Sequence, residues 1–301
     1  AGQGPVPCMR SATPQCQGWY ATNFAEGSWP FGVWRSDCFF LSSAAGQSSF
    51  SSENVRSCLE PCGAARTAYL IGDSHAGSHA AGLAASLQAY GIELRHAFAG
   101  YGCSFASDQF NEKLLDPVGS GWAYGKCTDW VAAVKSALTE FASPNDLIFT
   151  TTAAWKYDVV GNVDVAFVEE IATIAPLVVL GDAPLLRGIF GVNCAAPETR
   201  ASCLTDEKDT IPDGAVLAAE TWAARGVPFI SVRELFCSNS VCDAYIPGTD
   251  ILALVDYGHL TTAGSLYLAP FFSCALEGLG LVDAAAASSE DGECLGSVTD
   301  L

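Results

Sequence analysis

The chain is poor in basic residues. Its 301 residues include 14 Lys and Arg against 33 Asp and Glu, which gives a formal net charge of -19. Proteins that bind nucleic acid need Lys and Arg to replace the counterions of the phosphate backbone, and the same shortage disfavours electrostatic docking on anionic membranes. The composition therefore predicts no nucleic-acid partner, and it leaves neutral substrates and cationic glycans open.

Long apolar runs are also missing, although 50% of the residues are hydrophobic. The longest stretches, such as 175–180, have the length of a strand, whereas a membrane-spanning helix needs about 20 apolar residues. The chain opens at 1–5 without a signal-peptide pattern, which suits a mature end left by processing. A chain of this length and composition suits one α/β domain with an appendage.

The chain also lacks the cysteine spacing that is typical of zinc sites. The chain has thirteen cysteines, but no two of them form a Cys-x-x-Cys pair. So many cysteines without zinc spacing indicate disulfides and an oxidising compartment, and we predict a secreted or extracellular protein. The odd count leaves at least one thiol free or joined to another chain. Connectivity does not follow from sequence; our candidate pairs are Cys237–Cys242, Cys194–Cys203 and Cys103–Cys127.

Three segments differ in composition. Residues 1–66 hold five cysteines and three tryptophans without sustained periodicity, which predicts a disulfide-stapled N-terminal extension. Residues 282–301 are small and acidic and predict a C-terminal tail. Between them, at 67–281, strand and helix patterns alternate, which favours βαβ units and a parallel doubly wound sheet. The strand patterns lie near 68–72, 92–98, 146–151, 176–181 and 227–231. The helix patterns lie near 75–90, 128–142, 164–174, 212–225 and 262–278.

Two short motifs near opposite ends of this central segment carry the chemistry. Gly-Asp-Ser-His at 72–75 follows the first strand pattern and opens a helix, so Ser74 lies on a strand-to-helix turn. Asp-Tyr-Gly-His at 256–259 supplies Asp256 and His259. A serine needs an imidazole to take its proton, and the imidazole needs a carboxylate to fix its tautomer. Alone, Ser74 would fit a helix N-cap and His259 a surface loop.

The neighbours of Ser74 have competing roles. Asp73 is expected to satisfy turn amides. His75 and His79 are four residues apart on one helix, a spacing that can bind a metal. No further carboxylate or cysteine motif completes such a site, so we predict no metal and assign these histidines structural or supporting roles.

Three stretches in this order, 72–76, 236–242 and 256–261, resemble the SGNH (GDSL-like) hydrolase superfamily. The chain is most similar to the SGNH domain of acyltransferase-3-type polysaccharide O-acyltransferases. The resemblance implies a flavodoxin-like three-layer αβα sandwich, a Ser74–His259–Asp256 triad and no cofactor. It also implies a membrane acyltransferase as a partner or as a domain outside this chain.

The resemblance predicts the oxyanion hole only in part. It implies the backbone amide of Ser74 and an amide from a second block, which matches Gly100 or Gly102. The Asn of the third block is absent, because the sequence after the third strand reads Thr-Ala-Ala-Trp at 152–155. Trp155 and His75 are predicted to line the substrate pocket.

We therefore predict an extracellular serine O-acyl esterase or O-acyltransferase that acts on carbohydrate esters, with acetyl implied by the resemblance alone. The residues do not decide between water and a sugar hydroxyl as the acceptor. The alternative is a non-catalytic secreted structural or glycan-binding protein on the same scaffold, because a fold does not fix a function. The dense cysteines, the missing Asn and the Trp-rich extension favour that alternative, and the complete triad disfavours it.

Overall fold

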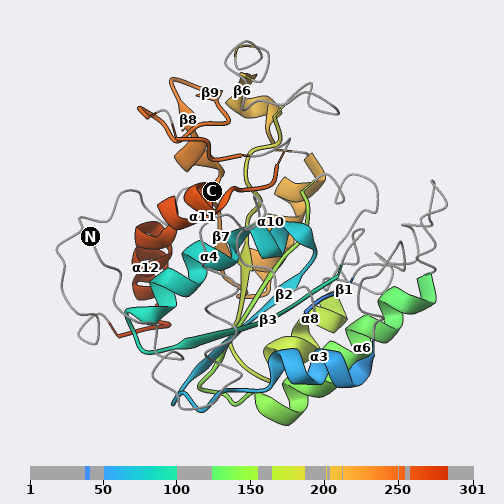
Figure 1. Cartoon of the computed structure of the whole chain (residues 1–301). Helices are drawn as coiled ribbons and strands as arrows, with labels where there is room; N and C mark the ends of the chain where they lie inside the picture. The colour runs from blue at the N-terminus through green and yellow to red at the C-terminus, as the bar shows by residue number, and fades with distance from the viewer. Residues whose placement is uncertain are drawn as a thin grey trace.

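The computed structural model describes residues 38–40, 51–99, 124–154, 165–186, 201, 204–211, 213–249, 251–254 and 258–283. The main sheet has six strands in the order β1-β3-β2-β4-β5-β7, and every pair is parallel (Figure 1). The strands are β1 (Phe39–Phe40), β2 (Thr67–Gly72), β3 (Glu93–Ala99), β4 (Leu147–Thr151), β5 (Leu177–Leu180) and β7 (Phe229–Ile230). Without β1, this is the flavodoxin-like order that the sequence analysis predicted.

Helices cover both faces of the sheet. The helices are α3 (Ser52–Leu59), α4 (Ser74–Gln88), α6 (Tyr124–Phe141), α8 (Val165–Ala172), α10 (Asp213–Ala224), α11 (Thr262–Tyr267) and α12 (Ala269–Gly278), with short 3-10 turns η2 (Glu207–Asp209) and η3 (Arg233–Phe236). In Figure 1, α4, α11 and α12 lie on one side of the sheet, and α3, α6 and α8 lie on the other. The predicted α/β sandwich with a parallel doubly wound sheet is confirmed.

Alternate side chains of the central strands build two cores. In β2, Ala68 and Leu70 join the core under α4 and α12, whereas Tyr69 and Ile71 join the core under α3 and α6. All four are fully buried. Successive side chains of a strand point to opposite faces, so a strand covered on both faces reads as a continuous apolar run. This is why the sequence showed these strands as short apolar blocks without alternation.

The described part of the predicted N-terminal extension joins the sheet. Strand β1 pairs with β3 at the edge, and the disulfide Cys38–Cys58 links the residue before β1 to α3. Val55 and Leu59 of α3 are buried in the same core as α6. The sequence analysis found neither element, because two strand residues and a helix of two turns leave too few positions for a periodic pattern.

A smaller antiparallel sheet lies at the top of Figure 1, in the order β6-β9-β8. Its strands are β6 (Thr205–Asp206), β8 (Cys237–Ser238) and β9 (Val241–Cys242). Asn239 and Ser240 form the turn of the β8–β9 hairpin with φ of 51° and 63°, as a tight hairpin requires. The disulfide Cys237–Cys242 closes this hairpin, and it is one of the three pairs named from the sequence.

The other two named pairs, Cys194–Cys203 and Cys103–Cys127, involve side chains outside the described residues. Where the structure describes cysteine side chains, every one is in a disulfide. These disulfides indicate an oxidising compartment.

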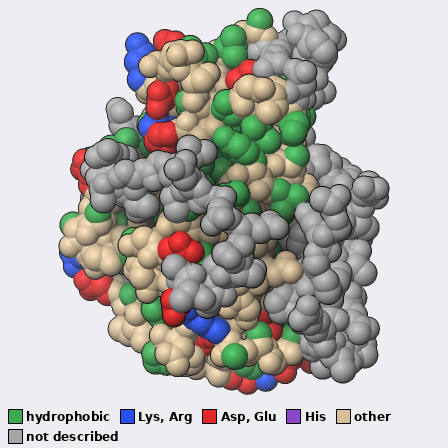
Figure 2. Space-filling view, turned by 90° about the vertical axis from the view of Figure 1, so that its left-hand side faces the viewer, with side chains coloured by type: hydrophobic (Ala, Val, Ile, Leu, Met, Phe, Trp, Pro, Cys, Tyr) green, Lys and Arg blue, Asp and Glu red, His purple; other side chains and the backbone are tan. Residues whose placement is uncertain are grey.

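Among the described helices, none combines the length and the apolar character needed to cross a membrane. Figure 2 shows the side of the molecule that is on the left in Figure 1. There, Lys and Arg are scattered among Asp and Glu, and they do not gather in one patch.

Candidate active site

Ser74 lies where β2 turns into α4, at the carboxyl edge of the sheet, and it is the first residue of that helix. The turn needs a glycine before it, because a Cβ at Gly72 would overlap the carbonyl oxygen of Thr151 and the side chain of Ala76. A glycine therefore lets the end of β2 lie directly against β4 and α4. Ligands of open parallel sheets bind beyond this edge.

Asp73 fixes the turn from its buried position. Its carboxylate accepts the backbone N–H of His75 at 2.8 Å and thereby caps α4. Its other oxygen accepts the N–H of Ala153 at 3.1 Å, which ties the turn to the segment after β4. Asp73 has the turn-stabilising role expected from the sequence.

His259 is carried by a loop between two fixed points. Leu254 and Leu260 form an antiparallel bridge across the base of this loop. Next to it, the hydroxyl of Thr261 donates to the carbonyl of Leu252 at 2.7 Å and accepts the N–H of Gly264 at 3.0 Å, which caps α11. The Leu-Thr that follows the histidine in the motif thus anchors the loop.

The structure brings Ser74 and His259 together from positions 185 residues apart: His259 Nε2 is 2.8 Å from Ser74 Oγ. This is hydrogen-bond distance between a hydroxyl and an imidazole nitrogen, the contact that a nucleophile and its general base require. Asp256, Gly100, Gly102 and Trp155 lie outside the described residues, so their predicted roles stay predictions.

The two histidines at the start of α4 have different surroundings. His75 is 2% exposed, and its Nδ1 is 2.8 Å from Asp182 Oδ1. His79, one turn later, is fully buried, and neither ring nitrogen has a hydrogen-bond partner in the described part of the chain. Desolvation by burial lowers the pKa of His79 from 6.5 to about 4, so this imidazole is neutral at physiological pH. The two rings therefore do not act as a pair.

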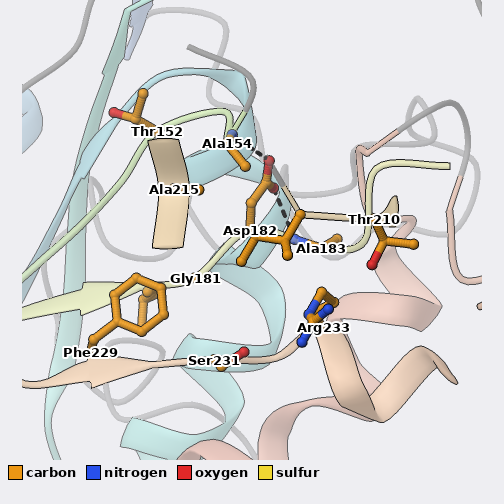
Figure 3. Close-up of a pocket in the computed structure, with 12 residues that line it drawn as sticks. Thr152, Ala154, Gly181, Asp182, Ala183, Thr210, Ala215, Phe229, Ser231 and Arg233 are labelled. Atoms are coloured by element: carbon orange, nitrogen blue, oxygen red, sulfur yellow. Dashed lines mark hydrogen bonds between the residues drawn. The ribbon is translucent and has the colours of Figure 1, made fainter. Parts of the chain in front are cut away.

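Asp182 is the site residue that the sequence analysis missed. It follows β5, and its side chain is 2% exposed. One oxygen also accepts the N–H of Ala183 at 2.9 Å, and the other accepts the N–H of Ala154 at 2.9 Å; both bonds are drawn in Figure 3. The signal was a Gly-Asp directly after an apolar strand, at 181–182, which repeats the Gly-Asp after β2 at 72–73.

These bonds engage the backbone after β4. The amides of Ala153 and Ala154 donate to the carboxylates of Asp73 and Asp182, so neither is directed at a substrate. By contrast, Ser74 is the first helical residue, and the first amides of a helix have no intrahelical acceptor. The Ser74 amide therefore has no acceptor within α4, and its role as an oxyanion donor stays a prediction.

A small pocket borders Asp182 between the ends of β4, β5 and β7 (Figure 3). Thr152, Thr210, Ser231 and Arg233 contribute polar side chains to its wall. Its volume of about 20 Å³ has room for roughly one water molecule. As the described residues shape it, this pocket does not hold a sugar.

A search of curated proteins finds no match. Among solved structures, the chain is similar to the Salmonella ser. Paratyphi A lipopolysaccharide acetyltransferase periplasmic domain, with a TM-score of 0.48 and 15% identity over 90% of this chain and 98% of that one. The family model described as "SGNH domain (fused to AT3 domains)" matches residues 37–273. The chain therefore belongs to the family of SGNH domains that are fused to AT3 domains.

Proposed function

We propose that the protein is an extracellular serine O-acyltransferase or esterase that acts on acyl esters of carbohydrates, acetyl esters first among them. The observation that carries the proposal is the 2.8 Å contact between His259 Nε2 and Ser74 Oγ at the carboxyl edge of the sheet. Membership in the family supports an acyl-transfer or ester-cleavage reaction. By the same membership, we propose that a membrane AT3 partner or domain supplies the acyl group.

The proposed reaction has two halves. Ser74 Oγ attacks the ester carbonyl carbon while His259 Nε2 takes the hydroxyl proton. The tetrahedral intermediate collapses, the C–O bond to the leaving alcohol breaks, and His259 returns the proton to that alcohol. A sugar hydroxyl or water then attacks the acyl carbon and gives its proton to His259. The bond between that carbon and Ser74 Oγ breaks, His259 returns the proton to Ser74 Oγ, and the acyl group leaves as an ester or a carboxylic acid. Asp256 would hold the other ring nitrogen of His259.

The charge of the intermediate must be held by backbone donors. We propose the Ser74 amide and an amide of Gly100 or Gly102 as these donors, because Ala153 and Ala154 are already engaged by carboxylates. Each well-placed donor contributes roughly 3–4 kcal/mol to the stability of the transition state. Trp155 is proposed to border the bound substrate.

Turnover of p-nitrophenyl acetate tests the proposal. Ser74→Ala and His259→Ala should each reduce kcat by about 10⁴-fold or more, and the double variant should be no slower, because the two groups act as one unit. A fluorophosphonate probe should label the parent protein and not Ser74→Ala.

The matched control is Ser86→Ala, which removes a buried hydroxyl from the same helix. Ser86 Oγ is 2.9 Å from the hydroxyl of Ser273, away from the carboxyl edge of the sheet. This variant should keep full turnover and labelling. If the parent shows neither turnover nor labelling, the catalytic proposal fails and the glycan-binding alternative takes its place.

A further inference from the structure

His75 and Asp182 are not members of the predicted Ser–His–Asp triad, yet the ring of His75 lies against the ring of His259. The rings of His75 and His259 have centroids 4.2 Å apart and are tilted by 36°. His75 also follows Ser74 directly in the chain, so one residue contacts both the helix start that carries the nucleophile and the ring that serves as the base.

The loop that carries His259 is shaped to rest on His75. A Cβ at Gly258 would lie 3.1 Å from His75 Cε1 and 3.0 Å from a methyl group of Leu185. Both distances are tighter than ordinary contacts, so a side chain at this position would push the His75 ring or Leu185 aside by a few tenths of an ångström, whereas glycine leaves both in place. The position of His259 thus depends on the position of the His75 ring.

Asp182 in turn fixes the ring of His75. Its carboxylate is held by two backbone amides, from Ala154 and Ala183, and these leave Oδ1 facing His75 Nδ1 at 2.8 Å. A carboxylate in this position accepts from the ring, so Nδ1 carries the proton and the ring cannot turn without losing the bond. If the carboxylate moved, buried donors would lose their acceptor, which costs free energy, so Asp182 stays in this position.

We propose that Asp182 and His75 are positioning residues of the reaction: Asp182 holds the tautomer and ring orientation of His75, and His75 supports the ring of His259 against Ser74. This role is proposed beside the pocket-lining role predicted for His75 from the sequence, which stays a prediction. The inference rests on the proposed function for its kinetic readout, and a spectroscopic readout tests it independently.

The kinetic test uses Asp182→Asn. The amide side chain keeps one acceptor oxygen, but in either orientation its NH₂ group faces a backbone N–H, that of Ala154 or that of Ala183. The side chain must therefore shift, and the ring of His75 loses a partner fixed by three bonds. We expect kcat for p-nitrophenyl acetate to fall about 10–100-fold, as small misplacements of reacting groups do, with KM unchanged. The double variant with His75→Ala should be no slower than His75→Ala alone, because both changes break one unit.

A conservative replacement should rescue part of the loss. His75→Asn places an amide N–H near the position of Nδ1 and keeps the bond to Asp182, so its kcat should exceed that of His75→Ala. Equal kcat for these two variants would mean that the bond to Asp182 does not matter, and the proposal would be wrong.

The matched control is Asp146→Asn. Asp146 is also buried and also accepts backbone amides, from Thr67 and Ser143, but it lies at the opposite edge of the sheet. It should lower stability and leave kcat per folded molecule unchanged. If Asp182→Asn behaves like Asp146→Asn in both respects, Asp182 is only structural and the proposal is overturned.

Imidazole ¹⁵N spectra separate this inference from the proposed function. The chain has only four histidines, so the signals can be assigned by substitution. Asp182→Asn should shift the ring signals of both His75 and His259, whereas Asp146→Asn should not. A shift in a protein that shows neither turnover nor fluorophosphonate labelling supports the positioning of the His259 ring and refutes the proposed function. Turnover with an unmoved His259 signal refutes the positioning role alone.

Discussion

Buried carboxylates lie at both edges of the main sheet, and they have different partners. At the amino edge, Glu93 accepts the N–H groups of Cys62 and Ala64, and the guanidinium of Arg95 lies 3.9 Å away. Asp146 likewise accepts the N–H of Thr67. At the carboxyl edge, Asp73 and Asp182 also collect backbone amides, but Asp182 adds an imidazole that leads to His259 and Ser74.

Some of these carboxylates only stabilise the fold, whereas Asp182 also contacts a residue that lies against the proposed base. A carboxylate that accepts amides stabilises a turn at either edge, because buried amides need acceptors. Asp182 bonds an imidazole where the carboxyl ends of parallel strands meet, which is the edge where ligands bind. Burial of a charged group alone does not identify a site, whereas its contact with an imidazole and a nucleophile does.

The largest change in stability is expected when the side chain of Asp146, at the amino edge, is truncated. Asp146 accepts the Thr67 N–H at 2.7 Å and both the N–H and the hydroxyl of Ser143, at 2.7 and 2.8 Å. Asp146→Ala should lower the free energy of unfolding by about 3 kcal/mol, because buried donors lose their acceptor. Urea titration measures the loss, and kcat per folded molecule should not change. A drop in kcat would show that the two edges are coupled.

A second prediction concerns the pH dependence of stability that the buried His79 of α4 causes. Unfolded His79 binds a proton below its ordinary pKa of 6.5, whereas folded His79 does so only below about 4. Between these values the unfolded state binds more protons, so the stability is fully present above pH 6.5 and falls as the pH falls. At about pH 5 the parent should have lost roughly 2 kcal/mol.

His79→Leu removes this titration and should flatten that part of the pH dependence. The measurement is the free energy of unfolding of parent and variant at about pH 7.5 and pH 5. Parallel slopes for the two proteins would show that His79 is not buried and neutral. Activity should respond little to this change, because His79 makes no bond to Asp182 or His259.

The smallest effect is expected at the surface. Arg56 of α3 donates two bonds to Glu140 of α6, at 3.0 and 2.6 Å, and both side chains are nearly half exposed. Arg56→Met should lower Tm slightly at low salt, because exposed ion pairs contribute little. Near 1 M salt, where the screening length is about 3 Å, most of that difference should vanish. A large decrease in Tm would show instead that this exposed ion pair stabilises the fold as strongly as the buried carboxylates do.

Much of the fold follows from local sequence patterns. The strand patterns near 68–72 and 146–151 correspond to β2 (Thr67–Gly72) and β4 (Leu147–Thr151). The pattern near 262–278 is correct as helix, but it contains two helices, because Pro270 near the start of α12 lacks the N–H that a continuous helix needs. Strand β1 was missed, because its place is set by pairing with β3 and not by its own residues.

The sequence by itself determined the alternation of strands and helices, the oxidising compartment and the turn that presents Ser74, because each depends on residues close together in the chain. Only the tertiary structure decided which carboxylate meets which imidazole. The order β2-β4-β5 brings the ends of β2 and β5 within reach, so Asp182 contacts His75 across 107 residues. Strand order arises from the packing of the whole domain, and no local pattern contains it.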